Sequence, residues 1–288
     1  ITSEVEHASI RDLVPLLCRL GGEVRHVPVH PSGELDMAAL YKLLQEFRPN
    51  LVSLMVANNE TGVVFPLPDI VDLCRSHEVS LHVDAVQALG KLPPSFWLRA
   101  DLVSISAHKI GGPKGAGALI VRNQHKLIAT HYGGPQELKR RGGTENMIGI
   151  AGFAGAISEL PDEAGIKRIE ELRNRFEKML QAQLLGITIH GQGTHRIHNT
   201  SNIRFHGVPN DALVGALDLD GVCASAGSAC SSGAVSPSHV LSAMGIEKSK
   251  AKEALRFGWG KTTAADDVDT VAKLVILHVN RIRSRKNN

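Results

Sequence analysis

The amino-acid sequence predicts an α/β fold in which a mainly parallel sheet is covered by helices. Two observations support this. Apolar runs of strand length alternate with amphipathic segments of helical length, and the 288 residues with 43% hydrophobic content suit a globular protein with a large core. In such sheets, ligands bind beyond the carboxyl ends of the strands. The loops that follow the strands are therefore the first places to search for a site.

The first 160 residues contain the clearest alternation. The apolar runs predict strands at residues 24–29, 51–56, 80–83, 102–106 and 118–121. Helical spacing of apolar residues predicts helices at residues 10–20, 37–47 and 68–77. We expect this part, residues 1–160, to form one large domain.

The pattern changes near residue 160, where a second and smaller α+β domain is expected at residues 161–288. A long charged helix is predicted at 162–185, followed by shorter elements. These are strands at 202–205 and 254–257, helices at 210–217, 237–244 and 264–282, and a loop at 226–236.

Composition excludes several classes of protein. The net charge of +3 is too small to indicate a nucleic-acid partner, and no apolar run is long enough to predict a membrane span or a signal peptide. The four cysteines form no CxxC pair and the histidines are scattered, so no metal site is expected. Cys18 and Cys74 lie among apolar residues and are predicted to be buried thiols. This cysteine usage predicts a reducing compartment, and we expect the cytoplasm.

Polar residues follow four of the predicted strands. Asp84 ends an apolar strand, where it either caps a helix or balances a buried cation such as a protonated pyridine nitrogen. Lys109 follows another strand and is either a surface residue or, with its pKa lowered by burial, a Schiff-base lysine. A lysine with an aspartate partner for a pyridinium nitrogen is the pairing that pyridoxal phosphate (PLP) requires. Ser106 and His108 could then donate hydrogen bonds to the phosphate, and His7 could stack on the ring, shuttle protons or be structural.

The predicted second domain contributes a cysteine and an arginine. Cys230 lies in a loop of small polar residues, where a mobile nucleophile is expected more than a packing residue, although an incidental surface cysteine is the alternative. Arg256 is flanked by apolar residues on a predicted strand, so its guanidinium needs a dedicated partner. That partner is either an α-carboxylate or a structural ion pair.

Taken together, these motifs resemble those of the cysteine desulfurases, within class V of the PLP-dependent aminotransferases. The resemblance spans nearly the whole chain and implies the fold type I of PLP enzymes, with a seven-stranded type of sheet. The long loop around Cys230 resembles the group that serves iron–sulfur assembly and nitrogen fixation. The matching motifs are Asn58-Asn59-Glu60-Thr61-Gly62, His82-Val83-Asp84-Ala85-Val86-Gln87, Ser106-Ala107-His108-Lys109, Gly143-Thr144-Glu145-Asn146, Gly227-Ser228-Ala229-Cys230 and Leu255-Arg256-Phe257.

The resemblance also implies a role for each matching residue. Lys109 would bind PLP as a Schiff base and carry protons, Asp84 would pair with the pyridine nitrogen, and Cys230 would take the sulfur of L-cysteine as a persulfide, leaving L-alanine. The remaining implied roles are ring stacking by His7, contacts to the phenolic oxygen by Gln87 and Asn59, phosphate binding by Ser106 and His108, contact with the partner subunit's phosphate by Thr144, and carboxylate binding by Arg256 and Asn59. A homodimer and a sulfur-acceptor protein, such as an iron–sulfur scaffold, are implied as partners.

The sequence departs from the family at its start. Family members begin well before the residue that corresponds to Ile1, with a loop at a helix start that binds the PLP phosphate. We therefore expect an N-terminally incomplete chain with weakened PLP binding. Two further hypotheses remain open: a selenocysteine lyase or another class V lyase, and an inactive remnant that only dimerises.

Overall fold

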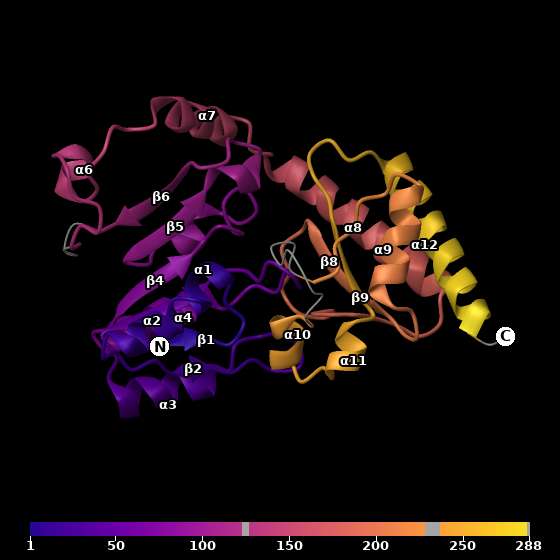
Figure 1. Ribbon diagram of the computed structural model, residues 1–288, viewed down its shortest axis with the longest axis horizontal. Helices are drawn as coiled ribbons and strands as arrows, with labels where there is room; N and C mark the ends of the chain where they lie inside the picture. Colours follow the sequence, from indigo (N-terminus) through magenta and orange to yellow (C-terminus); the bar gives the residue numbers. More distant parts are fainter. Residues whose placement is uncertain (123–126, 228–236, 287–288) are drawn as a thin grey trace. The chain divides into compact units, whose positions relative to one another are not determined.

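The computed structural model describes residues 1–122, 127–227 and 237–286, and the chain divides into two compact units (Figure 1). The first unit consists of Ile1–Phe47, Ala57–Pro66 and Pro161–Asn288. The second unit consists of Arg48–Val56 and Leu67–Leu160. The two domains expected from the sequence, residues 1–160 and 161–288, rest on the change of pattern near residue 160 and stay a prediction.

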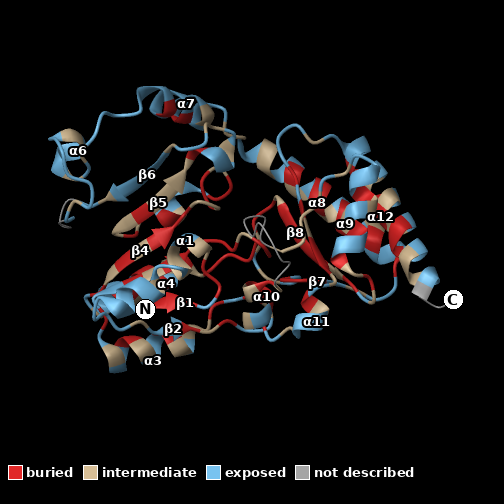
Figure 2. Ribbon diagram, in the orientation of Figure 1, coloured by how far each residue is buried: buried red, intermediate tan, exposed pale blue. Residues whose placement is uncertain are grey.

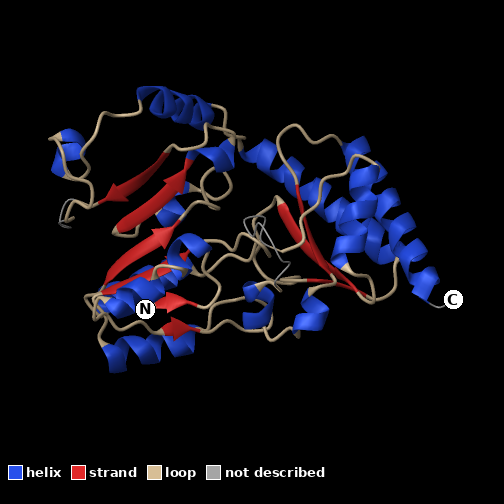
Figure 3. Cartoon of the chain, in the orientation of Figure 1, coloured by secondary structure: helices blue, strands red, loops and turns tan. Residues whose placement is uncertain are grey.

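The second unit is built on a mainly parallel sheet (Figure 3). Strands β3 (Leu51–Met55), β4 (Ser80–Asp84) and β5 (Leu102–Ser106) are parallel neighbours, and β6 (Gly117–Val121) pairs antiparallel with β5. Val52 and Leu54 of β3, Leu81 and Val83 of β4 and Val103 of β5 are buried, whereas Leu51 at the start of β3 is exposed. The unit's helices are α4 (Leu67–Ser76), α5 (Pro94–Trp97), α6 (Gln136–Lys139), α7 (Met147–Ser158) and the 3₁₀ helix Ala107–Ile110. The α/β prediction is therefore confirmed.

The first unit contains an antiparallel sheet with helices packed on it. Its strands are β7 (Ile187–Ile189), β8 (Thr200–Phe205) and β9 (Ala254–Gly258), in that order. Helices α8 (Glu163–Gln183), α9 (Asn210–Leu219) and α12 (Ala265–Lys286) bury their apolar sides against β8 and β9, and Figure 2 draws β8 largely as buried. The ring centroids of Phe176 and Phe257 lie 4.9 Å apart in this core. The short helices α10 (His239–Ala243) and α11 (Lys248–Ala251) precede β9.

The start of the chain also belongs to the first unit and differs in detail from the prediction. The single helix expected at 10–20 is two short helices, α1 (Ala8–Arg11) and α2 (Val14–Arg19), because Pro15 has no N–H and occupies the first turn of α2. The strand expected at 24–29 is only β2 (His26–Val27), which pairs in parallel with β1 (Thr2–Ser3) and ends before Pro28. Helix α3 (Met37–Phe47) has the predicted bounds.

Several further elements and one thiol differ from expectation. Helices α5, α6, α7 and α11 and strand β7 were not predicted from the sequence. Cys74 is buried as expected, but the prediction of a buried Cys18 is wrong. Cys18 lies on α2, which buries none of its residues, so its thiol is exposed. Nowhere in the described ranges is a helix long and apolar enough to cross a membrane.

Candidate active site

The predicted site residues fall into two groups, one in each unit. In the second unit, Asp84 is the last residue of β4 and remains only 9% exposed. Its Oδ1 accepts a hydrogen bond from the backbone N–H of Val86 at 2.9 Å, so the carboxylate caps the turn that follows the strand and not a helix. The second carboxylate oxygen is a further hydrogen-bond acceptor at the carboxyl edge of the sheet.

A histidine lies beneath Asp84 on the same face of the sheet. His82 is two positions before Asp84, so both side chains project to one side of β4. Its Nδ1 is hydrogen-bonded to Ser53 Oγ on β3 at 2.8 Å, and its Nε2 to Ser104 Oγ on β5 at 2.9 Å. Burial lowers the pKa of His82, which favours the neutral ring. The ring therefore joins three parallel strands just below the position of Asp84.

Lys109 lies in the turn that follows β5. Asp84 and Ser104 are partners in the β4–β5 register, so the residues that follow both strands lie at the same edge of the sheet. Ser106 Oγ and His108 Nδ1 are 2.6 Å apart, so the two side chains expected to bind a phosphate are hydrogen-bonded to each other. The 3₁₀ helix ends at Gly111, whose φ of 86° suits glycine. Lys109 is exposed, whereas the Schiff-base interpretation expects an apolar cleft.

Gln87 has a partner that sequence reasoning missed. It lies in the turn after β4, and its Oε1 accepts a hydrogen bond of 2.6 Å from Lys91 Nζ. Lys91 is only 9% exposed. Burial first, and then the positive charge of Lys109, lower the pKa of Lys91 to about 7. The one signal in the sequence was the spacing of four residues between Gln87 and Lys91, which places their side chains together in a helical turn.

Thr144 occupies an exposed loop between α6 and α7. The loop lines a pocket of the second unit together with Gly115, Ala116 and Gly117. Asn146 ends the loop by accepting a hydrogen bond from the N–H of Gly149 at 3.0 Å, which caps α7. The implied contact of Thr144 with a partner subunit's phosphate stays a prediction.

In the first unit, Arg256 and Asn59 are in direct contact. Arg256 lies on β9, and its Nη1 donates a hydrogen bond to the backbone carbonyl of Asn59 at 2.8 Å. This contact is with a carbonyl oxygen and leaves further guanidinium N–H groups for a carboxylate. The side-chain Oδ1 of Asn59 is buried and has no hydrogen-bond partner in the part of the chain that the structure describes.

The segment that carries Cys230 is attached beside these two residues. Cys230 itself, in the loop expected at 226–236, lies outside the described residues. Five positions earlier, Ser225 exchanges both backbone hydrogen bonds with Arg256, at 3.1 and 2.8 Å. After the loop, Ser238 Oγ donates to Glu60 Oε2 at 2.5 Å and accepts from the N–H of Leu241, which caps α10. Before the loop the chain thus pairs with Arg256, and after the loop it contacts Glu60, the residue that follows Asn59.

His7 has a structural role in this geometry. It precedes α1 and its Nδ1 accepts from the backbone N–H of Ser9 at 3.2 Å, so the ring caps the helix. The same nitrogen is 2.9 Å from Ser9 Oγ. The structural interpretation of His7 is thus supported by contacts, while stacking on a cofactor ring stays a prediction.

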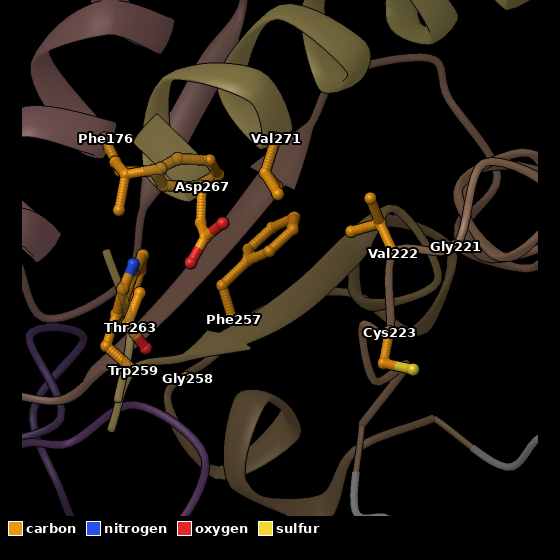
Figure 4. A pocket seen from close by; sticks show the side chains of 11 residues that line it. Phe176, Gly221, Val222, Cys223, Phe257, Gly258, Trp259, Thr263, Asp267 and Val271 are labelled. Carbon is orange, nitrogen blue, oxygen red and sulfur yellow. The ribbon is translucent and has the colours of Figure 1, made fainter. Parts of the chain in front are cut away.

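A pocket in the first unit contains none of the predicted site residues (Figure 4). It opens onto the core between β9 and α12, with Phe257, Trp259 and Asp267 in its wall and Cys223 at its margin. Asp267 accepts from the N–H of Ala264 at 3.0 Å at the start of α12, a capping contact. Within the described ranges, no three His, Cys, Asp or Glu side chains are grouped so that they could hold a metal ion.

Comparison with known proteins gives a consistent result. The model of the class-V aminotransferase family matches residues 1–271. A cysteine desulfurase IscS from Anaeromyxobacter sp. (strain Fw109-5) is 42% identical over 288 residues, which is 98% of this chain and 70% of that protein. A cysteine desulfurase from Klebsiella pneumoniae is 39% identical over 99% of this chain and 72% of its own.

Solved structures agree with the sequence relatives. A NifS-like protein from Rickettsia africae superposes with a TM-score of 0.86 at 28% identity, covering 97% of this chain and 75% of its own. DndA from Streptomyces lividans gives a TM-score of 0.77 at 34% identity, covering 90% of this chain and 74% of its own. Members of this family depend on pyridoxal phosphate. The chain therefore belongs to the class-V aminotransferase family and, within it, to the cysteine desulfurases.

Proposed function

We propose that this chain binds PLP and converts L-cysteine to L-alanine, with the sulfur transferred to Cys230 as a persulfide. One observation carries the proposal: Arg256 contacts Asn59 through its side chain and pairs through its backbone with Ser225, five positions before Cys230. An amino-acid carboxylate bound at Arg256 would thus lie beside the point where the cysteine segment leaves the sheet.

The residues present suit PLP. Asp84 offers a nearly buried carboxylate oxygen to the pyridine nitrogen. Lys109 supplies the amine, Gln87 a contact to the phenolic oxygen, and Ser106 with His108 a polar pair for the phosphate. When bound, PLP supplies an electron sink for the pair released at the substrate's α-carbon.

Lys109 and Asp84 divide the proton chemistry between them. Asp84 keeps a proton on the pyridine nitrogen, because a negative charge in a nearly buried position stabilises an adjacent cation. Lys109 would hold the cofactor through its Nζ, and the same amine would carry the proton at the substrate's α-carbon. Its exposed position in the second unit leaves Nζ free to move between these tasks.

Arg256 and Cys230 act on the substrate's two ends. Arg256 donates guanidinium N–H groups to the carboxylate, while the Cys230 thiolate forms a bond with the substrate sulfur. The substrate's carbon–sulfur bond breaks, its electron pair remains on carbon, and that carbon takes a proton and is released in alanine. Five residues of extended chain span at most about 17 Å, which sets the reach of Cys230 from Ser225.

The remaining assignments follow from the family and are proposals for this chain. We place the reaction in the cytoplasm, in a homodimer whose Thr144 reaches the phosphate held by the partner subunit. A sulfur-acceptor protein, such as an iron–sulfur scaffold, would take the persulfide sulfur from Cys230.

Alanine formation from L-cysteine tests the proposal, with PLP and a thiol reductant supplied. We expect stoichiometric alanine and sulfide from the wild-type chain, and none from Cys230→Ala or Lys109→Ala. Cys223→Ala and Lys114→Ala are matched controls, since both residues are exposed and neither has a proposed role. A folded wild-type chain that binds PLP but forms no alanine would contradict the activity and favour the inactive remnant.

A further inference from the structure

We propose that Lys91 is a positioning residue of the cofactor site: it fixes the carboxamide of Gln87 so that the amide NH₂ faces the phenolic oxygen of PLP. This inference rests on the proposed function, because it assigns Gln87 to the cofactor. Lys91 belongs to none of the motifs by which the chain resembles its family.

The turn after β4 brings the two side chains together. Backbone hydrogen bonds from Ala88 and Leu89 to the carbonyl of Ala85, at 2.9 and 3.0 Å, and from Lys91 to Ala88, at 2.9 Å, wind the chain into successive turns. Gly90 has a φ of 72°, and a Cβ there would lie 2.4 Å from Leu160 Cδ2. The backbone path that returns Lys91 toward Gln87 is therefore tightly specified.

Hydrogen-bond chemistry then determines which way the amide faces. A glutamine side chain has one oxygen that accepts and one NH₂ that donates, while a lysine ammonium only donates. Since Lys91 Nζ is 2.6 Å from Gln87 Oε1, the amide NH₂ must point away from Lys91. A reversed amide would place two donors against each other. Gln87 is thereby held as a donor, which is what a phenolate oxygen requires.

The burial of Lys91 makes its hydrogen bond to Gln87 a specific contact. A lysine that is only 9% exposed loses most of its hydration, and such residues need a specific partner. Burial and then Lys109 lower the pKa of Lys91 to about 7, and the ammonium form, which only donates, is the form that holds the Gln87 amide in this orientation. Because its pKa is lowered, Lys91 also carries less positive charge next to Lys109 at neutral pH.

A double-mutant cycle on PLP affinity tests the inference. PLP dissociation constants are measured by fluorescence titration for wild type, Lys91→Met, Gln87→Ala and the double variant, with Lys114→Met as the control at an exposed lysine. We expect Lys91→Met to weaken PLP binding about tenfold in the wild-type background and less than twofold in the Gln87→Ala background. Lys114→Met should bind as wild type does.

Two outcomes would overturn the assignment: unchanged PLP affinity in Lys91→Met, or an equal loss in both backgrounds, which would show that Lys91 acts without Gln87. Thermal unfolding of each variant checks that it is folded, and Lys91→Gln, polar but shorter, replaces Lys91→Met if the latter does not fold. If wild type binds PLP and forms alanine but the double-mutant cycle shows no coupling between Lys91 and Gln87, only this inference is refuted. Wild type that binds no PLP would refute the proposed function as well.

Discussion

At the scale of single residues, the cysteines differ sharply in their surroundings. Burial, and secondarily the charge of Asp101, raises the pKa of the Cys74 thiol to about 12, while Cys18 and Cys223 are exposed. In a Cys230→Ala variant at about pH 8, we expect iodoacetamide to modify Cys18 and Cys223 and to leave Cys74 intact, because the thiolate is the reacting form. Peptide mass spectrometry identifies the modified residues. Rapid labelling of Cys74 before denaturation would contradict its burial.

Arg256 tests the substrate contact at the same scale. Replacing it with alanine removes the guanidinium that would bind the substrate carboxylate, and hydrogen bonds to charged groups contribute about 1.5–3 kcal/mol. We expect kcat/KM for L-cysteine to fall about 10- to 100-fold in Arg256→Ala. Arg204→Ala is the comparison: Arg204 is also in the first unit but is paired with Glu253 and has no proposed substrate role. An equal loss of activity in both variants would argue for a structural effect.

At the scale of secondary-structure elements, a buried ion pair joins α8 to the chain before β8. Arg196 Nη1 and Nη2 donate to the two carboxylate oxygens of Glu177 at 2.9 and 3.0 Å, and each side chain is only 7% exposed. Ser201 Oγ on β8 also donates to Glu177 at 2.6 Å. Glu177 therefore holds both a cation and a strand in place.

Removal of that carboxylate should be costly. Glu177→Gln leaves the Arg196 guanidinium buried without its counter-charge, and we expect the free energy of unfolding to fall by about 3 kcal/mol. Glu46→Gln is the matched change at a well-exposed pair with Lys42 and should alter stability little. Denaturant unfolding of both variants measures the difference. If the free energy of unfolding falls as little in Glu177→Gln as in Glu46→Gln, water must enter beside Arg196 when the charge of Glu177 is removed.

At the scale of the whole molecule, the partly buried His82 and the buried His190 make stability depend on pH. Burial is the largest cause of the lowered pKa of both His82 and His190, so the folded protein favours their neutral forms. As pH falls below about 6.5, the unfolded chain binds protons that the folded chain does not, so the free energy of unfolding should decrease. The contribution is fully present above the unfolded pKa and is lost on acidification.

Urea unfolding from about pH 8 down to about pH 5 checks this expectation. His82→Asn should be less stable than wild type at about pH 8, because the bonds to Ser53 and Ser104 are lost, but should lose less stability on acidification. His30→Gln, at an exposed position, should follow the wild-type curve. Stability that rises on acidification would contradict the neutral forms of His82 and His190.

Local patterns in the sequence were sufficient for much of this molecule. Apolar runs located β3, β4 and β5, helical spacing located α3 with its observed bounds, and strand-end loops located Asp84 and Lys109. These features depend on residues near one another in the chain, whose alternation and propensity act over a few positions. Short elements were not predicted by such patterns. Strand β7 has only three residues, and the helix expected at 10–20 is divided at Pro15 although its apolar residues keep a helical spacing.

Only the tertiary structure decided the contacts between distant residues. Arg256 and Asn59 are 197 positions apart, and no periodicity relates them. The sequence could not reveal that Lys91 is buried against Gln87. It also could not reveal that Cys18 is exposed while Cys74, likewise among apolar residues in the sequence, is buried. Burial depends on what the rest of the chain places over a residue, and the pKa of a lysine or thiol follows from that burial. The sequence by itself thus determined the family and the chemical groups, and the packing decided which of them are oriented, paired or desolvated.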